Sequence, residues 1–128
     1  MPPSSDGARA AFLDRQVAGH AALRHLEADR GKRYVVYVLG APDLTYYARG
    51  RLLGQARGPY RVGRVRPLLA NAAGLHRALL EADADHFLIV GALRDRMPRN
   101  ADFARRFSLR FADDRSELFA LAPVPGPE

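Results

Sequence analysis

Two apolar segments constrain this fold more than any other feature of the sequence. The segments Arg33–Leu39 and His86–Leu93 consist mainly of β-branched, aromatic and aliphatic residues, without regular alternation of polar positions. Strands that are apolar on both faces are typical of a parallel sheet with helices on each side. A helical pattern that begins at Asn71 and ends near Asp83 lies between them. We therefore expect a right-handed βαβ crossover that places both strands in one sheet.

Three further helices are expected from the spacing of apolar residues and from capping residues. The spacing predicts a first helix over residues 8–29, which Gly19 could interrupt. Short helices are expected at 44–49 and at 100–106, each preceded by a polar capping residue. Residues 50–66 contain four glycines and a proline without a clear period, and therefore predict an irregular loop.

The C-terminal part of the chain predicts a hairpin. Residues 107–112 and 117–121 alternate around a polar turn, so we expect two antiparallel strands, with 117–121 as an exposed edge. The complete order predicts an α/β fold with a small three-layer, Rossmann-like sheet, mostly parallel, and a C-terminal antiparallel β-hairpin. We expect one α/β domain at 8–122, between a disordered leader at 1–7 and a disordered tail at 123–128.

The positive charge of the chain is concentrated in one segment. There are 20 Lys and Arg residues against 14 Asp and Glu, a formal charge of +6. The excess lies in residues 49–66, which contain no acidic residue and hold Arg49, Arg51, Arg57, Arg61, Arg64 and Arg66. Such a segment can bind phosphate, anionic lipid headgroups or nucleic acid, or it can pair with acids elsewhere in the fold. Nucleic acid is disfavoured, because Tyr60 is the sole aromatic residue among these arginines.

Three residues near the first strand are candidates for the rim of a ligand site, together with Tyr60 in the basic loop. Asp43 follows the carboxyl end of that strand, where ligands gather in α/β sheets, although capping of the next helix would also explain it. Tyr46 and Tyr47 are adjacent on the expected helix, so one can pack in the core while the other faces the loop.

No residue pattern indicates catalysis or metal binding. The chain has no cysteine, no phosphate-binding loop and no serine-hydrolase motif. His76, Glu81, Asp83, Asp85 and His86 are close in sequence, but their spacing predicts capping and solvation instead of a metal site. Asp113 and Asp114 are typical of a turn. We assign no catalytic residue, no metal and no cofactor, and leave open whether the chain is an enzyme.

The order of motifs resembles a known family. The pattern comprises a strand ending in Leu-Gly at 39–40, Pro-Asp-Leu-Thr-Tyr-Tyr-Ala-Arg at 42–49, Leu-Leu-Gly at 52–54 and Gly-Pro-Tyr at 58–60. The helix over 75–82, the strand at 86–90 and the final hairpin continue it. It resembles the soluble C-terminal extracytoplasmic domain of bacterial GT-C membrane glycosyltransferases, which are related to dolichyl-phosphate-mannose-type mannosyltransferases and to aminoarabinose transferases.

The resemblance implies a function that the residue patterns alone do not. It implies an accessory domain, non-catalytic alone, at the extracytoplasmic face of the bacterial inner membrane, with the transmembrane part of the parent enzyme as partner. The basic loop would contact the phosphate of a polyprenyl-phosphate sugar donor or an anionic lipid surface. The family's catalytic acidic residues have no counterpart here. The alternative is a free-standing α/β module that binds nucleotide or nucleic acid through the same arginines.

Overall fold

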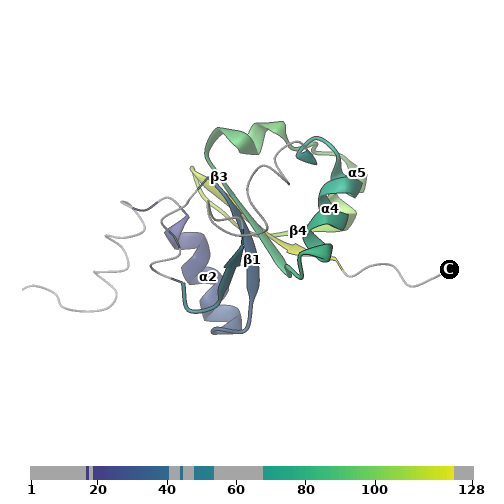
Figure 1. Ribbon diagram of the computed structural model, residues 1–128. Helices are drawn as coiled ribbons and strands as arrows, with labels where there is room; N and C mark the ends of the chain where they lie inside the picture. The colour runs from purple at the N-terminus through teal and green to yellow at the C-terminus, as the bar shows by residue number, and fades with distance from the viewer. Residues whose placement is uncertain (1–16, 18, 41–43, 45–47, 54–67, 123–128) are drawn as a thin grey trace, which may run out of the picture.

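The computed structural model describes residues 17, 19–40, 44, 48–53 and 68–122. Figure 1 shows the elements in chain order. They are α2 (His20–Arg30), β1 (Val35–Leu39), β2 (Arg51–Leu53), α4 (Ala72–Glu81), β3 (His86–Val90), the 3₁₀ helix η3 (Gly91–Arg96), α5 (Ala101–Arg106), β4 (Phe107–Ala112) and β5 (Ser116–Leu121). None of the described helices is long and apolar enough to cross a membrane.

The five strands form one sheet in the order β2-β1-β3-β5-β4. The first strand, β1, pairs in parallel with β2 on one side and with β3 on the other. The expected pairing of the two apolar strands is therefore confirmed, with α4 in the connection that leads to β3. The expected helix start is also confirmed, because the Asn71 side chain accepts a hydrogen bond from the Gly74 N–H.

The prediction of a mostly parallel, Rossmann-like sheet is wrong, because the sheet is mixed. After β4, the chain returns so that β5 pairs antiparallel with β3 and also with β4. These antiparallel ladders are longer than the parallel ones. The physical reason is burial. Leu118 and Phe119 on β5 are both buried although they point to opposite faces, so β5 is covered on both faces and suits an interior position.

The exposed edge of the hairpin is consequently β4, and the expectation of an edge at 117–121 is wrong. Ser108, Leu109 and Arg110 are all exposed. The register between β4 and β5 shifts between Leu109 and Phe111, which marks a β-bulge at Arg110. At the other edge, β2 has only 3 residues.

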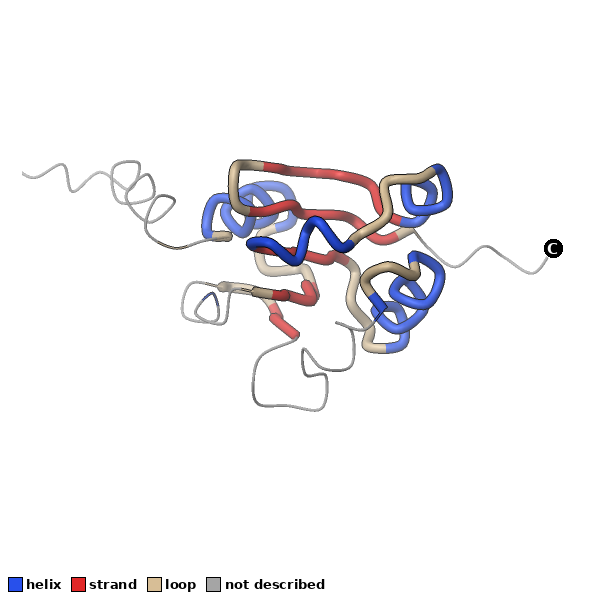
Figure 2. The backbone as a smooth tube through the Cα atoms, turned by 90° about the horizontal axis from the view of Figure 1, so that it is seen from above, coloured by secondary structure: helices blue, strands red, loops and turns tan. Residues whose placement is uncertain are grey.

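Helices cover both faces of the sheet, as Figure 2 shows: α2 lies on one side, and α4 and α5 lie on the other. The core on the α4 side is aromatic-rich and includes Tyr37, Leu75, Leu79, Phe87, Ile89, Phe103, Phe107 and Phe119. The core on the α2 side includes Leu23, Leu26, Tyr34, Val36, Val38, Leu88 and Leu118.

The predicted end of the strand at β3 is wrong, and the predicted turn of the hairpin is confirmed. The strand predicted to reach Leu93 ends at Val90, because Gly91 adopts a φ of 85° and starts η3. The predicted turn is confirmed: Asp113 Oδ1 accepts hydrogen bonds from the N–H groups of Arg115 and Ser116 and from the Ser116 hydroxyl.

Several predictions fall partly or wholly outside the described residues. The described first helix begins at His20, and most of the expected helix before it lies outside. The same holds for the leader, the tail, most of the loop at 50–66 and most of the helix at 44–49.

Candidate functional site

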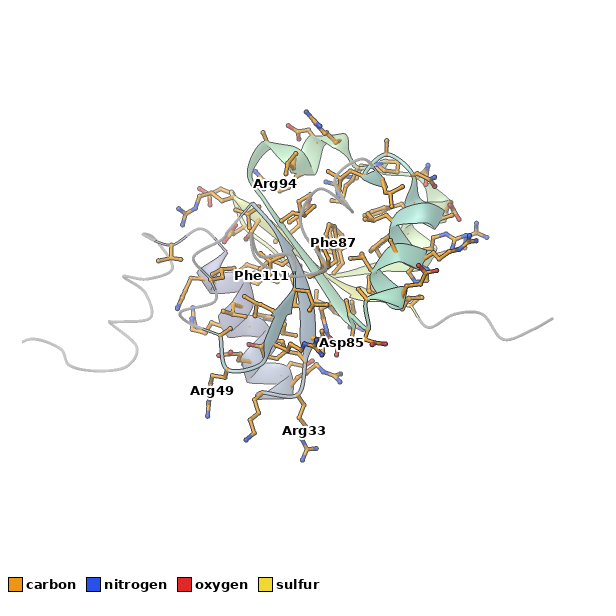
Figure 3. The ribbon with its side chains drawn as sticks, in the orientation of Figure 1. Arg33, Arg49, Asp85, Phe87, Arg94 and Phe111 are labelled. Carbon is orange, nitrogen blue, oxygen red and sulfur yellow. The ribbon has the colours of Figure 1, made fainter. Side chains whose placement is uncertain are left out.

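The two described arginines of the basic segment lie at the amino ends of the parallel strands. Arg51 begins β2 and is level with Val35, the first residue of β1. Figure 3 shows Arg49 at the same end of the molecule as Arg33, with both side chains pointing away from the sheet. The other sequence candidates, Arg57, Arg61, Arg64, Arg66, Asp43, Tyr46, Tyr47 and Tyr60, lie outside the described residues.

Three more cations lie at this end. Arg30 is the last residue of α2, and Lys32 and Arg33 lie in the connection to β1; all three are exposed, as are Arg49 and Arg51. We call Arg30, Lys32, Arg33, Arg49 and Arg51 the amino-edge surface. Sequence reasoning missed its first three members because it balanced all charges outside residues 49–66 as one total, which hid the local group at 30–33. The signal was available as Arg-Gly-Lys-Arg immediately before the first apolar strand.

Tyr34 holds the two halves of the amino-edge surface together. Its hydroxyl donates to Glu27 Oε2 on α2 at 2.5 Å and accepts the Gly50 N–H at 2.9 Å. The Arg49 N–H donates to the same Glu27 oxygen at 2.7 Å. The segment carrying Arg49 is thus fixed against α2 and β1 by backbone hydrogen bonds, which leaves its guanidinium free to face solvent.

Gly50 is required for this close approach. A Cβ atom there would lie 2.5 Å from the Tyr34 ring, well inside van der Waals contact. Burial, followed by the hydrogen bond to Glu27, raises the pKa of Tyr34 to about 12. The hydroxyl therefore stays protonated and remains a donor at physiological pH.

Within the described part of the chain, no cation of the amino-edge surface forms an ion pair, although the Glu27 carboxylate lies among them and accepts the Arg49 N–H. Ion pairs elsewhere join Arg99 to Glu117, Arg105 and Arg106 to Asp102, and, when its ring is protonated, His86 to Asp85. Arg30 Nε donates to the Arg33 carbonyl, which orients one of the cations. Clustered cations of this kind attract anions, and salt weakens the attraction.

A cleft of about 440 Å³ lies on the α2 face of the sheet. It is lined by His25, Leu26, Ala28, Asp29, His86, Leu109, Arg110 and Leu118, which come from α2, β3, β4 and β5. This volume lies within the range of small-molecule sites. The cleft opens between α2, which packs on this face, and the exposed strand β4, which forms the opposite wall.

His86 is held in one orientation in this cleft. Its Nδ1 lies 2.6 Å from Asp85 Oδ1, and the Asp85 carboxylate also accepts the Val35 N–H. Because the carboxylate oxygen accepts, Nδ1 carries the proton in neutral His86 and Nε2 is an acceptor.

The five residues considered for a metal site are dispersed. His76 Nε2 lies on the other side of the sheet, 2.7 Å from the Ala122 carbonyl, which accepts its proton. No three histidine or acidic side chains within the described ranges could hold a metal ion together.

The comparisons with known proteins place the chain in a family. A family model described as SF2091/S2213 matches residues 8–120, which is most of the chain. The chain belongs to the SF2091/S2213 family. No curated protein and no solved structure matches the chain significantly.

Proposed function

We propose that this chain is a non-catalytic accessory domain that binds phosphate-bearing lipid through the amino-edge surface. The observation that carries the proposal is the grouping of five exposed cations at the amino ends of β1 and β2, none of which forms an ion pair within the described residues. A cation near an anionic bilayer contributes about 1 kcal/mol of attraction. Five cations on one end are therefore enough for measurable, salt-sensitive binding.

The proposed parent protein is a membrane-embedded glycosyltransferase that uses a polyprenyl-phosphate sugar donor. Support comes from the motif order at 39–60 and 75–121, which resembles the extracytoplasmic domain of GT-C enzymes. In that setting the amino-edge surface would face the membrane or the donor phosphate at the extracytoplasmic side of the bacterial inner membrane. The transmembrane part of the parent enzyme would be the partner.

The surface favours lipid over nucleic acid. Base stacking needs exposed aromatic rings beside the cations. Tyr34, the aromatic residue at the centre of the amino-edge surface, is only 3% exposed and cannot stack on a base. Nucleotide or nucleic acid remains the alternative ligand of the same arginines, and the experiment below separates the two.

The test is co-sedimentation with vesicles of phosphatidylcholine alone, and with vesicles that also contain phosphatidylglycerol or a polyprenyl phosphate. We expect binding to both anionic kinds, falling as salt rises, and none to phosphatidylcholine alone. The triple variant Arg30→Gln, Lys32→Gln, Arg33→Gln should bind about 100-fold more weakly, from about 1 kcal/mol for each lost cation.

A matched control removes three charges elsewhere. Arg77, Arg96 and Arg105 are exposed on α4, η3 and α5, and their change to Gln should leave vesicle binding nearly intact. Equal losses in both triple variants would show that net charge alone matters and would overturn the proposal. Tighter binding to single-stranded RNA or DNA than to anionic vesicles, lost in the first variant, would replace lipid by the alternative.

A further inference from the structure

The cleft between α2 and β4 has an unsatisfied polar group at its floor. His86 is 5% exposed, and its Nδ1 is occupied by Asp85. Its Nε2 forms no hydrogen bond with any residue in the described part of the chain. A buried acceptor without a donor is costly, so this atom favours a ligand that brings a hydroxyl or N–H into the cleft.

The walls of the cleft supply a mixed set of groups. Asp29, on α2, is an acceptor, and Arg110, at the bulge of β4, is a donor; both are exposed. Leu109, which is exposed, adds apolar surface, and the His25 ring lies 5.4 Å from the ring of Phe111. The cleft thus offers two acceptors, one donor and flat apolar walls.

We propose that this cleft binds one neutral sugar ring, whose hydroxyls would donate to His86 Nε2 and Asp29 and accept from Arg110. Each sugar hydroxyl can both donate and accept a hydrogen bond, so the hydroxyls of one ring match the two acceptors and the one donor of the cleft. The C–H faces of the ring match Leu109 and the His25 ring, which both line the cleft. A volume of about 440 Å³ accommodates a single ring.

Other ligand classes fit less well. Asp29 and Arg110 carry opposite charges, so the cleft has no excess that would select an anion or a cation. A purely apolar ligand would remove water from both charges and from His86 without replacing their hydrogen bonds. The inference uses none of the amino-edge cations and does not depend on the function proposed above.

The test is NMR with isotopically labelled protein, using methyl glycosides of glucose, mannose, galactose and arabinose as probes. We expect at least one glycoside to shift the signals of His25, Asp29, His86 and Arg110 at millimolar concentration. Cyclohexanol, an apolar ring with one hydroxyl, and inorganic phosphate should not reproduce these shifts.

Two variants test the contacts without disturbing the core. Asp29→Ala and Arg110→Ala each remove an exposed side chain and should weaken glycoside binding about tenfold or more, because hydrogen bonds to charged groups are strong. The matched controls Asp95→Ala and Arg96→Ala change exposed residues on η3, at the opposite end of β3, and should leave binding unchanged.

The outcomes are distinct. No shifts with any of the four glycosides, equal shifts with cyclohexanol, or displacement of the sugar by phosphate would each overturn the inference. Asp29→Ala should still bind anionic vesicles, and the triple variant of the amino-edge surface should still bind the glycoside. The experiments therefore distinguish a failure of lipid binding at the amino-edge surface from a failure of sugar binding in the cleft.

Discussion

The Tyr34 hydroxyl and the Glu27 carboxylate meet at 2.5 Å and tie α2 to the start of the sheet. The same carboxylate oxygen accepts the Arg49 N–H, and the same hydroxyl accepts the Gly50 N–H. Two groups from two other segments therefore bond the phenol directly, and the Arg49 N–H is linked to it through Glu27. Loss of the phenol would affect both stability and the placement of the amino-edge surface.

Tyr34→Phe should lower the free energy of unfolding by about 1–3 kcal/mol, because it leaves Glu27 and the Gly50 N–H short of a partner while keeping the ring. Urea unfolding measures this loss. The same variant should bind anionic vesicles more weakly, since the segment of Arg49 loses an anchor. A variant as stable as the unchanged protein would show that the hydrogen bonds of the phenol to Glu27 and Gly50 contribute nothing to stability.

Alkaline pH should weaken the fold through the same residue. The pKa of Tyr34 is about 12 in the folded state, above its ordinary value of 10.0. The raised value means that the stabilisation is fully present below pH 10 and is lost as pH rises toward 12. Unfolding curves over this range should show a steeper decline for the unchanged protein than for Tyr34→Phe. Parallel declines would contradict the assignment.

Gly40 and Gly91 form a matched pair for a stability test. Both have positive φ, at 89° and 85°. A Cβ at Gly40 would overlap the Val90 carbonyl oxygen, whereas at Gly91 it would meet nothing within 4 Å. Gly91→Ala should cost about 1–2 kcal/mol from backbone strain alone, and Gly40→Ala should cost clearly more. Equal losses in chemical unfolding would contradict the close approach of β1 and β3 at this end.

Asp113 should be essential to the hairpin turn, and its neighbour Asp114 should not. Asp113→Ala leaves three donors without their acceptor and should cost about 1–2 kcal/mol, whereas Asp114→Ala should cost little. Urea unfolding of both variants measures the difference. Similar losses would mean that the turn does not depend on the Asp113 carboxylate.

Acid should remove the contribution of Asp113. Burial alone would raise the pKa of its carboxyl, but the hydrogen bonds from Arg115 and Ser116 outweigh burial and hold the pKa below its ordinary value of 3.8. A lowered value means that the stabilisation is present above about pH 4 and is lost as pH falls through the folded-state pKa. The unfolding free energy of Asp113→Ala should therefore decline less below pH 4 than that of the unchanged protein.

The local elements were readable from the sequence because local chemistry determines them. Asn71 and Asn100 each accept a hydrogen bond from the N–H three residues on, as polar capping residues do. The apolar runs at 33–39 and 86–93 predicted buried parallel strands, and the structure pairs β1 and β3 from these runs directly. A helix cap and an apolar run can each be recognised from a few residues that are close in the sequence.

The strand order of the sheet was misjudged, although part of the signal was present. A hairpin pattern does not say which of its two strands meets the rest of the sheet. Here each strand holds two polar residues, but in Ser116–Leu121 they are followed by an unbroken apolar run, in which Leu118 and Phe119 are buried on opposite faces. Weighing the two strands by burial on both faces would have placed β5 beside β3.

The cleft could not be read from the sequence. His25, His86 and Arg110 come from three distant segments, and only the docking of α2 and the position of β4 bring them to one site. His86 did attract attention through its acidic neighbours, but as a weak metal candidate. The partner that matters, Asp85, fixes the ring instead of binding a metal.

The two edges of the sheet bear on how this protein behaves at high concentration. An incoming strand from another molecule could pair with β2 over only 3 residues. At β4 it would meet the bulge and the Arg110 side chain part-way along the ladder. Short edges and charged, bulged edges both obstruct strand addition between molecules. We therefore expect the two edges of the described sheet to resist fibril growth better than a flat, unbroken outer strand would.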